Sequence, residues 1–345
     1  MRRRLVPAAL LLPLVLLASA CGGNSVANSS IGSGGGTDGK GSLTLNAGDQ
    51  KGGSEAVLRA AGELKNLDYR IKWSTFTSGP PLLEAVNAKA VDIGSVGNTP
   101  PVFAAGAGSK VTVVGALRGG SQGEAILVPK DSKLRKAADL KGKSVAVAQG
   151  SSAHYQLIAS LEQAGLTLSD VKVKYLQPAD ALAAYTSGSV DAWAVWDPYT
   201  SQVLQAGQGR VLADGKGVVN GLNFQVAAPS ALKDSKKVAA IKDFVDRLRR
   251  AQDWVYAHPE AWAKVWAKDT GLPYDVALAS VNRTNATRIP VAIDDALVAS
   301  EQEIADTFTS LELIPNKVDF AKYMDRRFND DLPPSTTAPR PAKES

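Results

Sequence analysis

The chain has 345 residues, which is room for two ordinary domains, and 44% of them are hydrophobic, as in a globular protein. One cysteine and two histidines exclude a disulfide within the chain, a cysteine-based metal site and a histidine-rich metal site. The formal net charge is +5, but residues 1–20 hold three arginines and no acidic residue, so residues 21–345 carry 36 basic and 34 acidic side chains. This near-neutral balance gives no argument for binding nucleic acid, and it requires that a bound anion be held by local groups.

The N-terminal segment predicts export. Residues 2–4 are all arginine, residues 5–17 are apolar apart from prolines, and residues 18–20 are small and directly precede Cys21. This order is typical of a secretion signal, and the apolar run is too short to span a membrane comfortably. Small residues before a cysteine resemble the lipobox of bacterial lipoproteins, which implies that residues 1–20 are a signal peptide and that Cys21 is acylated (palmitate). A plain secretory signal with a chance cysteine is the alternative, and the sequence leaves Sec or twin-arginine export open.

Two segments of biased composition flank the part expected to fold. Residues 21–41 are rich in glycine and small polar residues, so we expect a flexible tether between the lipid and the domain. Residues 333–345 contain four prolines and several serines and threonines, which predicts a disordered tail. The folded part is therefore expected at about residues 42–332.

Predicted strands and helices alternate along this folded part, which is typical of parallel sheets covered by helices. Strands are predicted at residues 43–47, 69–76, 91–96, 111–116, 125–128, 144–148, 171–175 and 192–196. Helices are predicted at residues 54–64, 80–88, 101–105, 153–164, 179–187, 236–257, 259–270, 274–286, 292–311 and 320–328.

The sequence contains an internal repeat. Residues 82–92 align with residues 181–191 at a constant offset of 99 residues, and both read as a helix, a tight turn and Val-Asp at the start of a strand. Each strand then runs into a proline-containing loop, at residues 97–100 and 196–198. The simplest interpretation is two lobes of similar design, each with a loop at the carboxyl end of a strand, where ligands bind in such sheets. Chance similarity of two amphipathic helices is the alternative.

Four loops after predicted strands open helices, at residues 50–54, 78–80, 97–100 and 149–152. Each offers free backbone N–H groups, and a helix N-terminus binds anions through these donors and its dipole. Several such ends in one cleft could hold a sulfonate, which has three acceptor oxygens and is always ionised. Serine, threonine, asparagine and glycine are also ordinary N-cap residues, so a capping role alone is an equal alternative for any single loop.

A few larger side chains near these loops have two interpretations each. Trp196 lies one residue past a strand and could present its ring to an alkyl tail, and Asp197 could cap the following helix or face an amine. Arg118 could pair with the anion or be solvated. His154 could donate to the ligand or to neighbouring backbone.

Six motifs together resemble the aliphatic sulfonate-binding proteins of ABC importers, and the likeness runs from about residue 43 to the C-terminal helices. The motifs lie at residues 76–88, 96–101, 124–132, 138–143, 150–154 and 188–199. The resemblance implies an α/β, two-lobed type II periplasmic-binding fold, with a mixed, mostly parallel sheet in each lobe and the ligand in the cleft between them. The implied lobes are residues 42–125 with 224–332, and residues 126–223.

The resemblance also implies the ligand contacts. With Gln50 from the first loop and Arg118 as the candidate cation, the expected set is Gln50, Ser78, Gly79, Asn98, Thr99, Arg118, Ser151, Ser152, His154, Trp196 and Asp197.

The expected function is the capture of an alkanesulfonate and its delivery to an ABC permease driven by a separate ATPase, for sulfur acquisition. The chain itself lacks a phosphate-binding loop, and we expect no cofactor, no metal, no catalysis and a monomer. The expected location is the outer face of the bacterial cytoplasmic membrane, by the lipid anchor. Taurine, nitrate or a thiamine-precursor pyrimidine are alternative ligands for the same role. An enzyme on the same scaffold and a sensory or adhesive lipoprotein are the competing functions.

Overall fold

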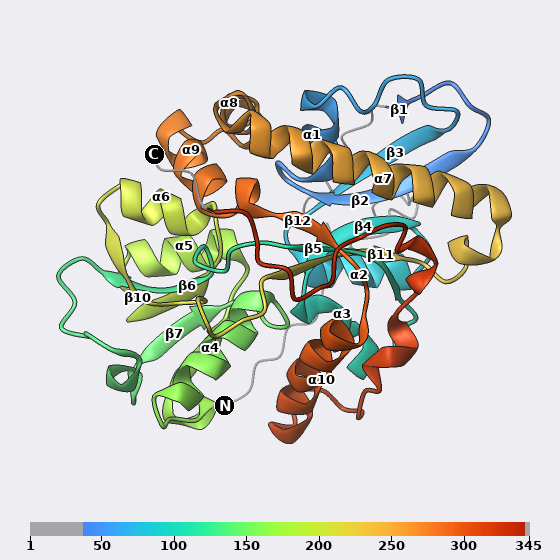
Figure 1. Cartoon of the computed structure of the whole chain (residues 1–345). Coiled ribbons are helices and arrows are strands. Elements are labelled where there is room, and N and C mark those ends of the chain that lie inside the picture. Colours follow the sequence, from blue (N-terminus) through green and yellow to red (C-terminus); the bar gives the residue numbers. More distant parts are fainter. Residues whose placement is uncertain (1–36, 342–345) are drawn as a thin grey trace, which may run out of the picture. The chain divides into compact units, whose positions relative to one another are not determined.

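The computed structural model of the chain describes residues 37–341, which form two β-sheets flanked by helices (Figure 1). The predicted signal peptide, Cys21 and nearly all of the predicted tether lie outside this range. No helix within it is both long enough and apolar enough to cross a membrane. The strands are β1 (Thr37–Asp38), β2 (Thr44–Gln50), β3 (Arg70–Phe76), β4 (Ile93–Gly97), β5 (Thr112–Arg118), β6 (Ala125–Pro129), β7 (Ser144–Val147), β8 (Lys172–Tyr175), β9 (Ala192–Val195), β10 (Gly209–Asp214), β11 (Leu222–Ala227) and β12 (Ile289–Val291).

Helices alternate with the strands in the first two thirds of the chain and dominate the last third. The α-helices are α1 (Ser54–Ala60), α2 (Gly79–Asn87), α3 (Thr99–Gly106), α4 (Ser152–Gln163), α5 (Pro178–Thr186), α6 (Tyr199–Gln205), α7 (Ser235–Ala257), α8 (Pro259–Thr270), α9 (Tyr274–Arg283) and α10 (Asp295–Ser310). Short 3-10 helices are η1 (Ala137–Leu140), η2 (Leu168–Asp170), η3 (Ala231–Lys233), η4 (Asn285–Thr287), η5 (Phe320–Tyr323) and η6 (Arg326–Phe328).

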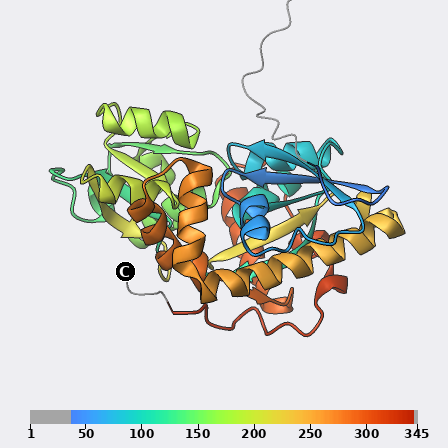
Figure 2. The same ribbon diagram turned by 90° about the horizontal axis from the view of Figure 1, so that it is seen from above.

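The first sheet has the strand order β1-β3-β2-β4-β11-β5-β12. Strand β2 runs parallel to β3 and β4, so these three strands end at the same edge of the sheet. Strand β11 runs antiparallel to both of its neighbours, β4 and β5. Helix α7 lies along one face and α2 and α3 lie on the other (Figure 2). Leu45, Ile71 and Ile93 of the strands between them are fully buried, and Trp73 of β3 contacts Phe244 of α7 with ring centres 5.9 Å apart.

The second sheet has the order β10-β6-β9-β7-β8, and its central strands are buried on both faces. Along β6, Ala125 and Leu127 pack in one core with α5 and α6, while Ile126 and Val128 pack in the other core with α4. All four side chains are fully buried. Because successive strand residues point to opposite faces, a strand between two helix layers reads as an unbroken apolar run.

The internal repeat appears as matching structure in the two sheets. Helix α2 with strand β4 corresponds to α5 with β9, and the orders β3-β2-β4 and β8-β7-β9 correspond as well. Asp92 accepts a hydrogen bond from the Asn46 main-chain N–H at 2.9 Å, and Asp191, 99 residues later, accepts one from the Ser144 N–H at 2.8 Å. The repeat therefore supplies two equivalent sheet edges on which loops can be placed.

The chain passes between the sheets at residues 119–124 and 215–221, and these two crossings lie side by side. The Gly119 N–H donates to the Gly221 carbonyl at 3.0 Å, and Ser121 Oγ donates to the Gly215 carbonyl at 3.0 Å. Gly221 has φ +69°, and a Cβ there would clash with the Gly119 carbonyl, so this close approach requires glycine. The crossings are thus a narrow, glycine-rich connection between the two sheets.

The structure confirms the α/β class, but the sheets are less parallel than the alternation of elements predicts. Among the described residues, six of ten strand pairings are antiparallel. The reason is that β6 and β11 each follow a crossing and run antiparallel to both of their neighbours, which gives four of these six pairings. The helix predicted at 320–328 is instead two 3-10 turns, η5 and η6, because Asp325 accepts from the Arg327 N–H between them.

The C-terminal segment also differs from the sequence prediction of a disordered tail. Asp294 accepts hydrogen bonds from both the main-chain N–H and the hydroxyl of Ser335, at 2.8 and 2.5 Å, and Ser335 is buried. The Pro333 carbonyl accepts from Ala292, and the Arg340 guanidinium lies over the ring of Tyr256 at 4.6 Å. These contacts offset the conformational entropy that the segment loses when it becomes ordered, which its proline-rich and polar composition does not reveal.

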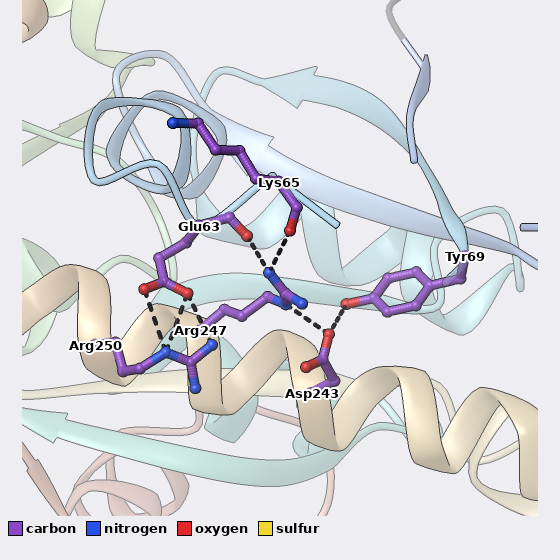
Figure 3. A network of polar contacts seen from close by, with 6 residues as sticks. All are labelled: Glu63, Lys65, Tyr69, Asp243, Arg247 and Arg250. Atoms are coloured by element: carbon purple, nitrogen blue, oxygen red, sulfur yellow. Dashed lines mark hydrogen bonds and ion pairs between the residues drawn. The ribbon is translucent and has the colours of Figure 1, made fainter. Parts of the chain in front are cut away.

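A polar network joins the connection between α1 and β3 to helix α7, which lies along one face of the first sheet (Figure 3). Arg247 donates to Asp243 at 2.6 Å and to the main-chain carbonyls of Glu63 and Lys65 at 2.6 and 3.0 Å. Tyr69 donates to the same Asp243 carboxylate at 3.0 Å. The Arg247 side chain is only 15% exposed, so its partners are partly shielded from water.

Replacing Arg247 with alanine should lower the free energy of unfolding by about 2 kcal/mol, because it leaves the carbonyls of Glu63 and Lys65 without this donor and Asp243 with only Tyr69. Arg250→Ala is the matched control on the same helix: its side chain is 52% exposed, and its pair with Glu63 should contribute less than about 1 kcal/mol. Urea unfolding of the two variants measures the difference. Equal effects would show that the network is not what holds this connection.

Candidate functional site

Three helices begin at the carboxyl-terminal edges of the two sheets. Helix α2 follows β3 through Ser78, α3 follows β4 through Asn98, and α4 follows β7 through Ser151. Ser78 and Asn98 occupy the N-cap positions, but neither side chain caps its helix. Only Ser151 does so, accepting from the His154 main-chain N–H at 3.3 Å. Uncapped first turns leave their N–H donors and the positive end of the helix dipole to another acceptor.

Two proline pairs limit the donors at these helix ends. Residues 80–81 and 100–101 are prolines at the second and third positions of α2 and α3, and proline has no N–H. The main-chain N–H groups of Gly79, Thr99 and Ser152 donate to no other described residue. All three residues are buried. The site therefore has a small number of defined neutral donors rather than a row of them.

The three helix ends converge. A Cβ added at Gly79 would lie 2.6 Å from Pro100 Cγ, so the N-termini of α2 and α3 touch. A Cβ added at Gly97 would clash with Ser152 Oγ, so the loop before α3 touches the N-terminus of α4. Because α4 packs on the second sheet and α2 and α3 pack on the first, both sheets contribute donors to one place.

A side-chain pair also joins the two sheets at this edge. Ser78 Oγ donates to Gln177 Oε1 at 3.0 Å, and the residues are 99 positions apart. They are the N-caps of α2 and α5, the two equivalent helices of the internal repeat. Gln177 is exposed and Ser78 is fully buried, so Gln177 covers the serine from outside.

The amide of Asn98 has a fixed orientation. Its Nδ2 donates to Asn220 Oδ1 at 2.9 Å, and its Oδ1 accepts from Thr99 Oγ1 at 3.0 Å. Asn220 Oδ1 also accepts from the Leu222 N–H at 3.0 Å, which identifies that atom as the acceptor. Asn98 and Thr99 are buried, so this chain of hydrogen bonds holds the first turn of α3 in place.

His154 is fully buried in the first turn of α4 and is neutral. The Gly150 N–H donates to Nδ1 at 3.3 Å, so the ring proton is on Nε2, which lies 3.3 Å from the Tyr175 hydroxyl. Phe103 and Phe308 of the first sheet's helices pack against the ring, at 6.0 and 5.3 Å between centres. Burial lowers the pKa of His154 to about 4. Its ring nitrogens already have partners, so its role here is packing and orientation.

The first loop differs from the other three. Both oxygens of Asp49 accept from the first turn of α1, from the Ser54 N–H at 2.7 Å and the Glu55 N–H at 2.8 Å. This N-terminus is therefore occupied by a carboxylate of the chain itself. Burial raises the pKa of Asp49 to about 7, against the lowering effect of these N–H donors. Gln50 remains available only through its side chain, whose Nε2 lies 3.3 Å from the Ser95 carbonyl.

Asp197 is held away from solvent beside the crossing. Its peptide bond to Pro198 is cis, and its Oδ1 accepts from the N–H and the hydroxyl of Ser201 at 2.9 and 2.7 Å. Its Oδ2 is buried without a hydrogen bond and lies 4.0 Å from Arg283 Nε. Burial raises the pKa of Asp197, while Arg283 opposes the shift. Trp196, directly before it, is half-buried and packs against both cores of the second sheet.

Glu124 and Arg288 extend this cluster. Burial raises the pKa of Glu124 to about 7, and the Arg288 charge opposes that shift. Burial lowers the pKa of Arg288, whereas Glu124 and Asp197 raise it. The acidic and basic groups beside the crossing thus largely compensate one another, and none presents an uncompensated positive charge.

Arg118, the expected cation, is engaged elsewhere. It ends strand β5, and its Nη1 donates to the Ser335 carbonyl of the C-terminal segment at 2.6 Å. The structure therefore does not bring its guanidinium together with the helix N-termini.

Three residues at the site were not predicted from the sequence. The offset of 99 residues carried on from Ser78 leads to Gln177, so the repeat contains the signal for that residue. Asn220 stands in an Asn-Gly pair before β11, and nothing in the sequence links it to Asn98. Arg283 closes α9 more than eighty residues after Asp197, and their pairing depends on the tertiary fold.

The arrangement suits binding rather than catalysis. Within residues 37–341 no group of His, Cys, Asp and Glu side chains could hold a metal ion. His154 Nε2 faces Tyr175 and not a serine, so Ser151 and Ser152 lack an activating base. What remains is a set of buried neutral donors, which can hold an anion without a counter-charge.

Comparisons with known proteins show the family and the overall fold of the chain. The model of the NMT1-like family matches residues 54–268. The chain is 39% identical over 282 residues to a protein of Escherichia coli strain K12 named for binding aliphatic sulfonates, which covers 80% of this chain and 86% of that one. The alkanesulfonate-binding protein of Xanthomonas axonopodis pv. citri, solved with MOPS bound, superimposes with a TM-score of 0.75 at 34% identity, over 84% of this chain and all of that one. The E. coli periplasmic aliphatic sulphonate-binding protein gives 0.72 at 36%, over 81% and 97%.

The buried neutral ring of His154 predicts a measurable acid sensitivity. Its folded pKa of about 4 lies below the unfolded value of 6.5, so the folded state binds the proton less tightly. The free energy of unfolding is therefore unaffected by His154 above about pH 6.5, and it falls by up to about 3 kcal/mol as the pH drops towards 4. NMR titration of His258→Gln, which leaves one histidine, should show the ring neutral down to about pH 4. Titration of that signal near pH 6.5 would contradict the buried, neutral assignment.

Proposed function

The chain belongs to the NMT1-like family, and from that premise we propose that it is the solute-binding component of an ABC importer that captures an alkanesulfonate. The observation that carries the proposal is the convergence of the N-termini of α2, α3 and α4, with free N–H groups at Gly79, Thr99 and Ser152. The relatives named for binding aliphatic sulfonates support the choice of ligand.

A sulfonate matches these donors chemically. It has three equivalent acceptor oxygens, a single charge that does not titrate, and no proton to donate, so it needs donors and no acceptor. Neutral N–H groups at helix ends compensate one negative charge without the desolvation cost of a buried cation. A dianion such as sulfate would bring a second charge for which the described site has no free partner. The proposed contacts are Gln50, Ser78, Gly79, Asn98, Thr99, Ser151, Ser152 and Trp196, with Gln177 added by the structure.

The two sheets and their narrow connection support a ligand-driven closure. Lobes of residues 42–125 with 224–332, and of 126–223, would turn about the paired crossings, and a ligand contacting α2 and α3 on one side and α4 on the other would hold them together. The closed form would dock on a permease whose ATPase is a separate chain. The protein acts outside the cytoplasm in this scheme, held to the membrane by a lipid on Cys21.

Calorimetric titration tests the ligand. Ethanesulfonate should bind, and propionate, of the same chain length with one oxygen fewer, should bind at least roughly tenfold more weakly, because one donor is left unpaired. Taurine, sulfate and nitrate complete the series. If no sulfonate gives a binding heat, the proposed function is wrong. If nitrate or taurine binds more tightly than ethanesulfonate, that compound is the better candidate for the ligand.

An internal carboxylate at the site should compete with the ligand. Ser78→Asp places a negative charge at the N-terminus of α2, as Asp49 does in α1, and should weaken ethanesulfonate binding at least roughly tenfold. The control is Ser189→Asp, the same change at an exposed position of the second sheet's unit. Unchanged affinity in Ser78→Asp would show that the anion is not held at this helix end.

The lipid anchor has its own test. Cys21→Ser should move the protein from the membrane fraction to the soluble extracytoplasmic fraction, because a single hydroxyl cannot take the thioether-linked lipid. Ser25→Ala, in the same tether, should stay with the membrane. A Cys21→Ser protein that sediments with membranes would argue for another anchor.

A further inference from the structure

Glu301 is a fully buried acid without a counter-charge. It lies on α10, and its relative exposure is 0%. Its Oε1 accepts one hydrogen bond, from Asn220 Nδ2 at 2.7 Å, and its Oε2 is buried without a partner. Among residues 37–341, no lysine or arginine forms an ion pair with it. An ionised carboxylate in such surroundings is strongly disfavoured, and a neutral acid is not.

Hydrogen bonds connect this acid to the anion site in two steps. Asn220 Nδ2 donates to Glu301 and, at 3.2 Å, to Ser300 Oγ, so the other end of the Asn220 amide must accept. That end accepts from Asn98 Nδ2 at 2.9 Å, which turns Asn98 Oδ1 towards Thr99. Each link fixes the direction of the next one. Asn220 belongs to the second crossing, so the chain of hydrogen bonds also includes the connection between the sheets.

We propose that Glu301 is a positioning residue that works as a neutral carboxylic acid, orienting Asn98 and the first turn of α3 through Asn220 and keeping negative charge away from the bound anion. The proposal rests on the proposed function for its ligand. Ionisation of Glu301 would add a buried negative charge on the side of Asn98 and Asn220 away from solvent-exposed groups of α10, and it would repel an anion held by neutral donors. Anion affinity should therefore fall as the pH rises.

Among the ionisable groups on and around α10, Glu301 is the one that would make the anion affinity fall as the pH rises. Helix α3 packs against α10 and carries no ionisable side chain, and Lys322 of η5 pairs with Asp319 at 3.2 Å. From α4, Tyr155 lies near the acidic residues of α10, which with burial raise its pKa further above 10. His154 is neutral above about pH 4. The other carboxylates of α10 are Asp295, Glu303 and Asp306, and all three are exposed. Burial raises the pKa of Glu301 well above its usual range.

The test compares wild type with Glu301→Gln, which copies the neutral acid: its Oε1 can accept from Asn220, and its Nε2 replaces the acid O–H. Ethanesulfonate is the probe, because it does not titrate, and its affinity is measured between about pH 6 and about pH 9.5. Relative to Glu301→Gln, wild type should lose up to roughly tenfold in affinity per pH unit above the Glu301 pKa, because Asp49 and Glu124, whose pKa values burial raises to about 7, titrate in both proteins. Glu303→Gln, exposed two residues further on, should behave like wild type.

A second measurement does not need the ligand. Because the folded pKa of Glu301 lies above the unfolded value of 4.5, its contribution to the free energy of unfolding is greatest below about pH 4.5 and falls as the pH rises towards the folded pKa. Urea unfolding should therefore show wild type losing stability relative to Glu301→Gln as the pH rises. The proposal is overturned by equal pH dependence of stability in the two proteins, or by a tenfold weaker Glu301→Gln near pH 6. If no sulfonate binds wild type, the proposed function fails, while the unfolding data still decide whether Glu301 is neutral.

Discussion

A buried anion without an adjacent free cation must be stabilised by dipoles, and the backbone decides how many are available. In this protein the count is small. Proline pairs remove two N–H groups each from α2 and α3, and Asp49 occupies the first turn of α1. Gly79, Thr99 and Ser152 remain, and they come from three helices and both sheets. A ligand that uses all three would bridge the sheets, so the proposed binding and closure would be one event.

The fold supplies this geometry through duplication. The parallel strands β3-β2-β4 and β8-β7-β9 each direct their following loops to one edge, and glycines at the contact points let the helix ends approach without side-chain clashes. The crossings keep the two edges facing each other. Charges beside the crossings, in Asp197, Arg283, Glu124 and Arg288, compensate one another, which leaves the neutral donors as the features that favour an anion.

Much of this could be predicted from the sequence, for physical reasons that differ between residues. Apolar runs and their turns place α8 at Pro259–Thr270 as predicted, because its first proline and its final glycine are local signals. The loops that hold Ser78, Asn98 and Ser151 are likewise local strand-to-helix patterns. Asn220, Arg283 and Glu301 could not be found in this way, since each acquires its role from a partner distant in sequence. Arg118 shows the converse: its charge suggests a ligand contact, but Ser335, 217 residues later, takes its guanidinium.

The most direct test of the central claim is a crystal structure of the protein with ethanesulfonate. Sulfonate oxygens should lie within about 3 Å of the main-chain nitrogens of Gly79, Thr99 and Ser152, with no arginine in contact. A sulfonate that binds Arg118 or Arg283 and makes no contact with those three N–H groups would contradict the central claim.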